Sequence, residues 1–403
     1  MNNIRKAWTV VIAGFGVNLT LGFLYSWGVI ASTLSDQLGW SAFQTQIPYM
    51  VASILFALSM IPGGRIQDRK GPRIPLWLAS ALAGTGFFLA SRFLSVTGLT
   101  LFFGIFFGLA MGFGYAAPTP AAVKWFHLQN RGLISGIVVS GYGLAPIYIA
   151  PLSHFLLSRY GIEGTFIIFS LLLTTILFVL SLLLTNPPPS FSPVLLSFGR
   201  KIILPTTRDY SVTEMMRTKT FLKLWVLFFL GTFSGLLVIG QMSKIAQEVA
   251  GIEQGFLSVM FYALANFLGR LSWGSLSDRI GRIKSLLITF AIQAGIFFVF
   301  EKMTNPTLLL FAKSCVGFTF GGMLALFPAL CADFFGLKNL GLNYGILFTA
   351  WGVGGVIGPF IGGFSRDLTG SHTLSFLISG CASVLGIIVS IFLQRSQHPK
   401  QVF

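Results

Sequence analysis

The sequence predicts an all-α membrane protein in which twelve transmembrane helices form two pseudo-symmetric six-helix bundles. Three observations predict this fold. Hydrophobic residues make up 54% of the chain and charged residues only 9%. Apolar runs of about 20 residues, long enough to cross a bilayer, recur along most of the chain. Short motifs of the first half also reappear about 210 residues later, which is the mark of an internal repeat.

The twelve apolar runs divide into two groups of six, with one group in residues 1–185 and the other in residues 221–403. They are 7–30, 43–64, 74–92, 98–121, 131–153, 164–184, 221–247, 255–276, 284–301, 307–330, 341–364 and 371–394. Spans and short loops therefore occupy nearly the whole chain, and no soluble domain fits between them. The first run follows Arg5 and Lys6 as in a signal peptide, but it is too long and has no cleavage pattern, so we interpret it as an uncleaved helix.

The longest non-apolar stretch, 186–220, is predicted to be a cytoplasmic linker between the bundles. Three consecutive prolines, 187–189, end the sixth helix because proline cannot continue it. A basic segment follows. Residues 210–217 are interpreted as a short helix on the inner membrane surface, with a disordered tether as the alternative.

The net charge of +16 is distributed unevenly between the predicted loops. With a cytoplasmic N-terminus, twenty lysines and arginines fall on the cytoplasmic side. Five fall outside: Arg92, Arg159, Lys244, Lys302 and Arg366. This bias places both termini in the cytoplasm. It also explains the basic character of the chain without nucleic acid, which we do not expect as a partner. The minimal loops indicate a bacterial inner membrane.

Two motif pairs define the repeat. Gly64-x-x-x-Asp68-Arg69-x-Gly71-x-Arg73 recurs as Gly274-x-x-x-Asp278-Arg279-x-Gly281-Arg282-x-Lys284, at an offset of 210 residues. Asn130-Arg131-Gly132-Leu133-x-x-Gly136-Ile137 recurs as Asn339-Leu340-Gly341-Leu342-x-x-Gly345-Ile346, at an offset of 209. Membrane proteins built from two such halves are usually transporters that bind substrate between the halves.

The repeated Asp-Arg loops are predicted to be conformational latches at the cytoplasmic face. The aspartate of each loop can accept hydrogen bonds from a helix N-terminus or from an arginine of a neighbouring helix. The alternative is that the loops only set topology through their positive charge. The predicted gating residues are Asp68, Arg69, Arg73, Asp278, Arg279 and Arg282.

The loops and spans together resemble the major facilitator superfamily, and within it the chain is similar to the oxalate/formate antiporter family, which is related to the monocarboxylate transporters. The resemblance runs from end to end. It rests on LGWS at 38–41, GRIQDR at 64–69, GFGY at 112–115, KWF at 124–126, NFLGRLSWG at 266–274, FPAL at 327–330 and GLNYGILFTAWG at 341–352.

Arg270 is the foremost candidate for binding a substrate. It lies eight residues before Asp278, roughly 12 Å deeper in the membrane on a helix. All eleven carboxylates fall in loops or at span ends. An arginine without a fixed acidic partner suits a carboxylate held by two parallel hydrogen bonds, with backbone carbonyls alone as the alternative. The resemblance implies the same role. Asn266 lies one turn away on the same face.

Tyr115, Tyr25 and Trp351 are further candidates to line the site, with ordinary packing as the alternative for the two tyrosines. The resemblance implies a lysine in the segment around Trp351 in the family's oxalate transporter. The aromatic residue here therefore favours a monocarboxylate. Lys313 could add a second charge, but it lies near a predicted span end, and we expect it to snorkel to the interface.

These observations predict a carrier of small organic anions such as lactate, pyruvate or formate, with oxalate as a further candidate. It would work by alternating access, as an anion exchanger or as a proton symporter. The competing hypotheses are an exporter of amphipathic drugs or siderophores, and a sensor. No nucleophile–base or metal-ligand cluster is visible in the sequence, so we expect neither an enzyme nor a cofactor. We expect a functional monomer.

Overall fold

A computed structural model describes residues 2–188, 191–196, 208–250, 255–303, 305–369 and 371–397, and nearly all of them are helical. The first half contains α1 (Asn2–Leu21), η1 (Gly22–Ser26), α2 (Trp27–Leu38), α3 (Ala42–Lys70), α4 (Arg73–Arg92), α5 (Val96–Leu99), η2 (Thr100–Phe107), α6 (Gly108–Ala116), α7 (Pro118–Val123), η3 (Leu128–Asn130), α8 (Arg131–Leu144) and α9 (Pro146–Leu183). The linker contains α10 (Val212–Met216). The second half contains α11 (Lys219–Ala250), α12 (Gly255–Ile280), α13 (Arg282–Val299), η4 (Phe300–Lys302), α14 (Pro306–Phe335), α15 (Leu340–Thr369) and α16 (Thr373–Gln397).

The helices reproduce the predicted number of membrane crossings. Ten helical segments of the described chain are long and apolar enough to span a bilayer. One of them, Leu128–Leu183, has 56 residues and is broken at Gly161, whose φ of 64° favours glycine. It therefore supplies two crossings. α12, with 26 residues, is also long enough to cross a bilayer, and it packs against α14 and α8. The prediction of an all-α membrane protein with twelve spans is confirmed.

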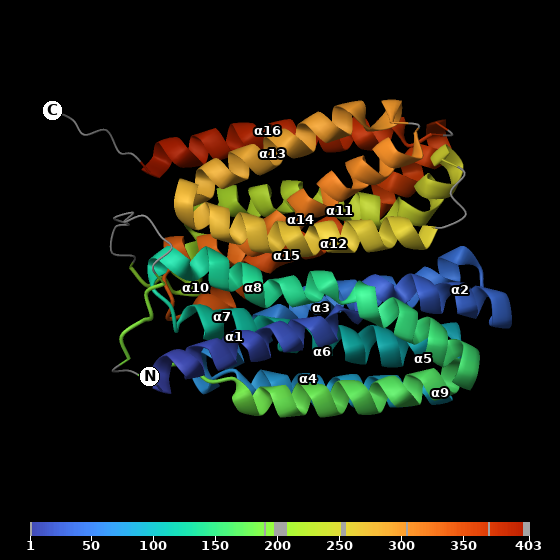
Figure 1. The fold of residues 1–403 in the computed structure, drawn as a ribbon, viewed down its shortest axis with the longest axis horizontal. Helices are drawn as coiled ribbons and strands as arrows, with labels where there is room; N and C mark the ends of the chain where they lie inside the picture. The colour runs from blue at the N-terminus through green and yellow to red at the C-terminus, as the bar shows by residue number, and fades with distance from the viewer. Residues whose placement is uncertain are drawn as a thin grey trace.

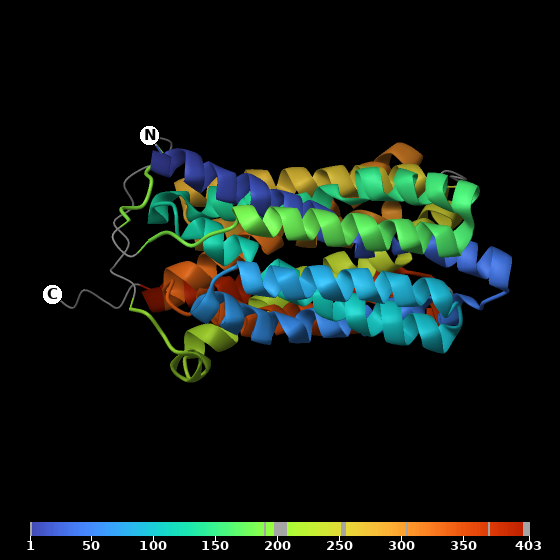
Figure 2. The ribbon, with the colours of Figure 1, turned by 90° about the horizontal axis from the view of Figure 1, so that it is seen from below.

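Two helical bundles lie side by side, the first half below the second in Figure 1. α3 packs against α15, and α8 packs against α12, so these four helices join the halves. The start of α1, the end of α16 and α10 all lie at the left of Figures 1 and 2. We call this the terminal end of the molecule. The domain boundaries predicted from the sequence, 1–185, 186–220 and 221–403, stay a prediction.

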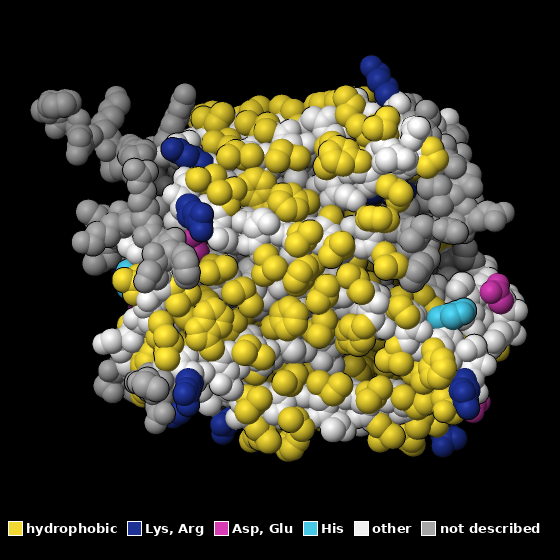
Figure 3. Space-filling model, in the orientation of Figure 1, with side chains coloured by type: hydrophobic (Ala, Val, Ile, Leu, Met, Phe, Trp, Pro, Cys, Tyr) yellow, Lys and Arg dark blue, Asp and Glu magenta, His cyan; other side chains and the backbone are white. Residues whose placement is uncertain are grey.

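Hydrophobic side chains cover most of the face in Figure 3, and Lys, Arg, Asp and Glu gather toward its ends. Large apolar side chains such as Leu171, Leu222 and Phe311 are more than half exposed. A soluble surface rarely carries so much apolar area, whereas lipid tails cover it at no cost. This pattern is what a bilayer-embedded protein requires.

The linker helix and the side chain of Lys313 were both predicted from the sequence. Residues 212–216 form a short helix, started by a reciprocal pair of bonds between Ser211 and Glu214, so the prediction of a helix is confirmed. The basic segment before it lies outside the described residues. The prediction for Lys313 was wrong: its side chain is fully buried rather than at the interface, because α14 runs through the centre of its bundle.

Candidate functional site

Asp68 joins the two halves at the terminal end. It lies in the last turn of α3, opposite the start of α15 in the other half. Its carboxylate accepts hydrogen bonds from the backbone N–H of Gly341, at 3.0 Å, and of Leu342, at 2.8 Å. The first N–H groups of a helix have no hydrogen-bond partner within it and carry partial positive charge. A carboxylate accepts their hydrogen bonds and also balances their charge. We call this contact the first interlock.

Asp278 makes the same contact in the opposite direction. It lies near the end of α12 and accepts bonds from the N–H of Gly132, at 2.9 Å, and of Leu133, at 2.7 Å, where α8 begins. We call this the second interlock. The two motif pairs of the repeat therefore bind one another across the halves. The predicted contact between each aspartate and a helix N-terminus is confirmed, while its role as a latch stays a prediction.

The repeated glycines allow the two backbones to touch at each interlock. A Cβ atom on Gly64 would lie 2.1 Å from the carbonyl oxygen of Gly341, and one on Gly274 would lie 2.5 Å from that of Gly132. Both distances are far below van der Waals contact. The glycine spacing of the motifs is thus a requirement of the interface between the halves.

Ion pairs support the two interlocks differently. At the first, Nζ of Lys124 lies 3.6 Å from Asp68. Burial lowers the pKa of Lys124, and the negative charge of Asp68 opposes this shift. At the second, Arg282 bridges Asp278 and Asp333, at 2.6 and 2.9 Å. Arg131 of the first half pairs with Asp333 at 3.3 Å, which adds a further tie between the halves.

Three predicted gating residues are not brought to the interlocks. Arg69 and Arg279 are exposed at the surface. Arg73 is also exposed and donates to the carbonyl of Leu182 within its own half. These three arginines place positive charge on the outside of the terminal end. This position fits the alternative that the loops set the membrane topology through their positive charge.

Arg270 lies deeper between the halves and is fully buried. Its Nε donates to Oδ1 of Asn266 at 2.7 Å, and its Nη1 donates to the carbonyl of Val139, in the other half, at 2.6 Å. Its Nη2 forms no bond of full hydrogen-bonding geometry with any described residue, although the hydroxyls of Tyr25 and Tyr115 lie near the guanidinium. None of the ion pairs formed by the described side chains includes Arg270. Carbonyl groups alone therefore do not satisfy this guanidinium.

An aromatic cluster with rings from both halves begins beside Arg270. The ring of Tyr142 lies 6.0 Å from its Cζ and packs edge-on against the rings of Tyr25 and Tyr115. The rings continue through Phe56 to Phe348 and Trp351 of the second half, with centroids 5.0 to 5.9 Å apart. We call this set the central cluster: Arg270, Asn266, Tyr25, Tyr115, Tyr142, Phe56, Phe348 and Trp351. The five residues proposed from the sequence thus come together in one place.

Sequence reasoning missed Tyr142, Phe56 and Phe348. The repeat contained a signal for two of them. Tyr142 lies 209 residues before Trp351, and Phe56 lies 210 residues before Asn266. Equivalent positions of two related halves face the same interface, so the partner of each candidate was itself a candidate.

The central cluster contains hydrogen-bond donors that its own side chains do not use. Among its described side chains, Nη2 of Arg270 and Nε1 of Trp351 are buried donors that form no bond of full hydrogen-bonding geometry, and neither can accept a bond. Within the part of the chain that the structure describes, the hydroxyl of Tyr344, next to Phe348, also forms no bond of full hydrogen-bonding geometry, although Tyr115 lies nearby. Such an arrangement suits a small anion with an apolar body.

A separate apolar pocket of about 300 Å³ lies on the membrane-facing side between α3 and α15. Its lining contains no charged residue: Ile54, Ala57, Leu58, Thr349, Gly352, Val353, Val356 and Ile357. It therefore offers an anion nothing to bind, and the central cluster is the better candidate site.

The chain belongs to the major facilitator superfamily, whose family model matches residues 9–300 and 224–403. It is 32% identical to the MFS-type transporter YhjX of Escherichia coli strain K12, over 88% of this chain and 87% of the relative. It is 28% identical to the oxalate:formate antiporter of Oxalobacter formigenes, over 95% and 90%. Monocarboxylate transporter 13 of Rattus norvegicus is 26% identical, over 96% and 88%.

Solved structures of the superfamily share the fold. The proton:xylose symporter XylE superposes with a TM-score of 0.71 at 14% identity, over 98% of this chain and 96% of that one. The Escherichia coli fucose:proton symporter FucP superposes with a TM-score of 0.68 at 15% identity, over 95% and 99%. The resemblance to this superfamily seen in the sequence is confirmed.

Proposed function

We propose that this member of the major facilitator superfamily is a secondary active transporter of small organic anions. It would carry a monocarboxylate such as lactate, pyruvate or formate, with oxalate as a further candidate. The observation that carries this proposal is Arg270, a fully buried cation whose Nη2 forms no bond of full hydrogen-bonding geometry with any described residue. A carboxylate can accept from a guanidinium through two parallel bonds, which makes arginine well suited to it.

The relatives support the same substrate class. Two of them are named as an oxalate:formate antiporter and as a monocarboxylate transporter, and both align over at least 95% of this chain. The aromatic rings beside Arg270 favour a substrate with a small apolar body. Arg270 supplies one positive charge to the central cluster, which balances a monocarboxylate better than a strongly hydrated dianion.

A physical link connects binding to movement of the halves. Arg270 of α12 donates to the carbonyl of Val139 in α8, so its guanidinium ties the two halves together. A carboxylate that binds this guanidinium competes with that tie. Opening the terminal end further requires Asp68 and Asp278 to release four backbone N–H groups. We propose that the terminal end is cytoplasmic, as the loop charges predict, and that the membrane is the inner membrane of a bacterium.

Uptake into liposomes that contain the purified protein tests the proposal and separates the two coupling modes. Labelled lactate is added outside, while unlabelled lactate, formate, oxalate or buffer alone is inside, at two external pH values. Uptake that requires an internal anion indicates exchange. Uptake into empty vesicles driven by external acid indicates proton symport. If no carboxylate moves in any arrangement, the proposal fails.

A second candidate function is export of amphipathic drugs or siderophores. The aromatic content of the central cluster and the apolar pocket between α3 and α15 favour it. Such a substrate would not depend on one cation, so an exporter should keep its activity when Arg270 is replaced by alanine. An anion carrier should lose it.

A further inference from the structure

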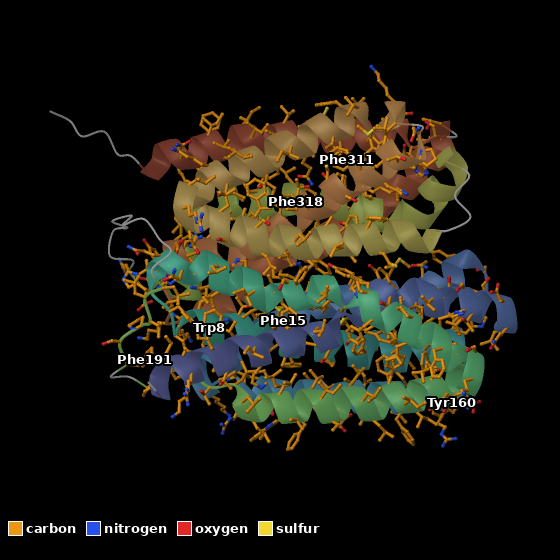
Figure 4. All side chains as sticks on the ribbon, in the orientation of Figure 1. Trp8, Phe15, Tyr160, Phe191, Phe311 and Phe318 are labelled. Atoms are coloured by element: carbon orange, nitrogen blue, oxygen red, sulfur yellow. The ribbon has the colours of Figure 1, made fainter. Side chains whose placement is uncertain are left out.

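The segment that follows α9 lies against the loop before α8. The N–H of His127 donates to the carbonyl of Val194, and the N–H of Val194 donates to the carbonyl of Trp125, both at 2.9 Å. Phe191 packs against the ring of Trp125 at 4.8 Å, and Figure 4 shows it at the same end as Trp8. These contacts hold residues 191–196, which we call the first arm of the linker, in place.

Asn130 fastens the first arm to the start of α8. Its Oδ1 accepts from the N–H of Leu196 at 3.0 Å, and its Nδ2 donates weakly to the carbonyl of Leu196 at 3.5 Å. Asn130 is buried and immediately precedes α8. Gly132 and Leu133, two and three residues further along the chain, donate the hydrogen bonds of the second interlock.

The segment before α10 fastens to the start of α15 in an equivalent way. The N–H of Tyr210 donates to the carbonyl of Phe335 at 3.0 Å. Nδ2 of Asn339 donates to the carbonyl of Tyr210 at 2.9 Å, and Nδ2 of Asn343 to the same oxygen at 3.2 Å. Asp209 accepts from the N–H groups of Leu337 and Lys338, at 2.9 and 3.0 Å. We call residues 208–210 the second arm.

Asn130 and Asn339 occupy equivalent positions of the repeat, 209 residues apart, and each binds one arm of the same linker. We propose that both are positioning residues, through which the linker arms hold the starts of α8 and α15 so that their N–H groups face Asp278 and Asp68. The linker then stabilises the closed terminal end in addition to connecting the halves. The proposal rests on the interlocks and is independent of the substrate.

The charge of Asp209 also reaches the first half. Although Asp209 binds the loop of the second half, its negative charge acts on Lys124 and Arg131 of the first half. Lys124 is the cation beside Asp68, and Arg131 pairs with Asp333. This influence is the weakest among those on either cation, and it agrees with a linker that lies against both halves.

The test uses the full chain with Cys315→Ser, Cys331→Ala and Cys381→Ser, so that one new cysteine reports on closure. The reporter is Ser135→Cys, because Ser135 is fully buried between the halves and its hydroxyl donates to the carbonyl of Ala325. In this background, Asn130→Ala and Asn339→Ala are combined, and the rate of maleimide labelling is measured in detergent. The matched control is Asn305→Ala, which removes an asparagine cap at the start of α14.

We expect the double variant to be labelled about tenfold faster than the parent, and the control variant within twofold of it. A labelling rate of the double variant within twofold of the parent would overturn the proposal. If the double variant does not fold, hydrogen exchange in residues 127–137 and 336–346 of each single variant replaces labelling. Exchange there must rise several-fold, and unchanged exchange overturns the proposal.

Substitution by aspartate distinguishes a positioning role from a general loss of stability. Asn130→Asp keeps the oxygen that accepts from Leu196, so its labelling should stay within threefold of the parent. Asn339→Asp loses the donor and places a carboxylate against the carbonyl of Tyr210, so it should be labelled at least as fast as Asn339→Ala. Equal behaviour of the two aspartate variants would overturn the proposed bonds.

Discussion

The N-terminal and C-terminal halves meet through equivalent positions but carry different side chains there. At the terminal end the halves agree, because Asp68 and Asp278 each bind the start of a helix in the other half. Deeper in the membrane they differ. Asn266 and Arg270 of the second half correspond to Phe56 and Met60 of the first. Among the described side chains of the central cluster, the only cation is therefore Arg270, which comes from the second half.

This comparison separates two kinds of constraint. The interlocks use backbone N–H groups and glycines, which depend on helix position, and a repeat preserves helix position. The central cluster depends on side-chain chemistry, which can change in one half without disturbing the packing of the other. We infer that scaffold and substrate binding are divided in this way between equivalent positions of the two halves.

The largest expected effect distinguishes Arg270 from Met60. Arg270→Ala should lower carboxylate uptake at least about thirtyfold, because removing one partner of a buried charged contact costs about 2 kcal/mol or more. Met60→Leu should leave uptake within threefold. Both are measured in liposomes with equal amounts of inserted protein. An Arg270→Ala protein that transports at the level of the parent would remove Arg270 from the site.

The interlocks should differ in strength. Asp278→Asn should lower the free energy of unfolding by about 2–3 kcal/mol, and Asp68→Asn by about 1–2 kcal/mol, because Asp278 also pairs closely with Arg282. Thermal unfolding of both variants in one detergent gives the ranking. If Asp68→Asn were the more destabilising change, the additional ion pairs at the second interlock would not make it the stronger of the two.

Tyr142 and Trp351 form an equivalent pair within the central cluster. Nε1 of Trp351 has no partner among the described residues, whereas the hydroxyl of Tyr142 contacts the sulfur of Met111 at 3.5 Å. Trp351→Phe should therefore raise KM for the anion about fivefold, as expected for one hydrogen bond of about 1 kcal/mol. Tyr142→Phe should change KM less than twofold. Similar KM values for both variants would exclude Trp351 as a donor to the substrate.

The smallest effect is expected at Lys124, whose equivalent in the second half is Asp333. Lys124→Met should change the free energy of unfolding by about 1 kcal/mol or less, because Nζ lies as far as 3.6 Å from Asp68. Asp68 also keeps both backbone bonds. Asp333→Asn, which removes one ion pair each from Arg131 and Arg282, provides the comparison, and equal effects would argue against the asymmetry of the interlocks.

Much of the candidate site could be predicted because charge is rare in this chain. An arginine within a span is costly and must face a protected interior, so Arg270 could be identified without a structure. The same reasoning failed for Lys313. Distance from a span end indicates how far a side chain must reach, but the exposure of Lys313 depends on which neighbours enclose α14. Tyr142 and Phe348 were missed because aromatic residues are frequent in the sequence and most of them only pack.

Hydropathy and the repeat by themselves determined the class of fold, the two halves and the equivalence of their motifs, because bilayer thickness and duplication leave their mark in the linear order of residues. Only the tertiary structure decided what those motifs bind. The repeat does not reveal that the Asp-Arg loop of one half meets the Asn-x-Gly-Leu segment of the other. Gly132 and Asp278 are more than 140 residues apart in the sequence, so their contact depends on how the two bundles pack against each other. The asparagines that fasten the linker are likewise ordinary loop residues until the fold brings the arms against them.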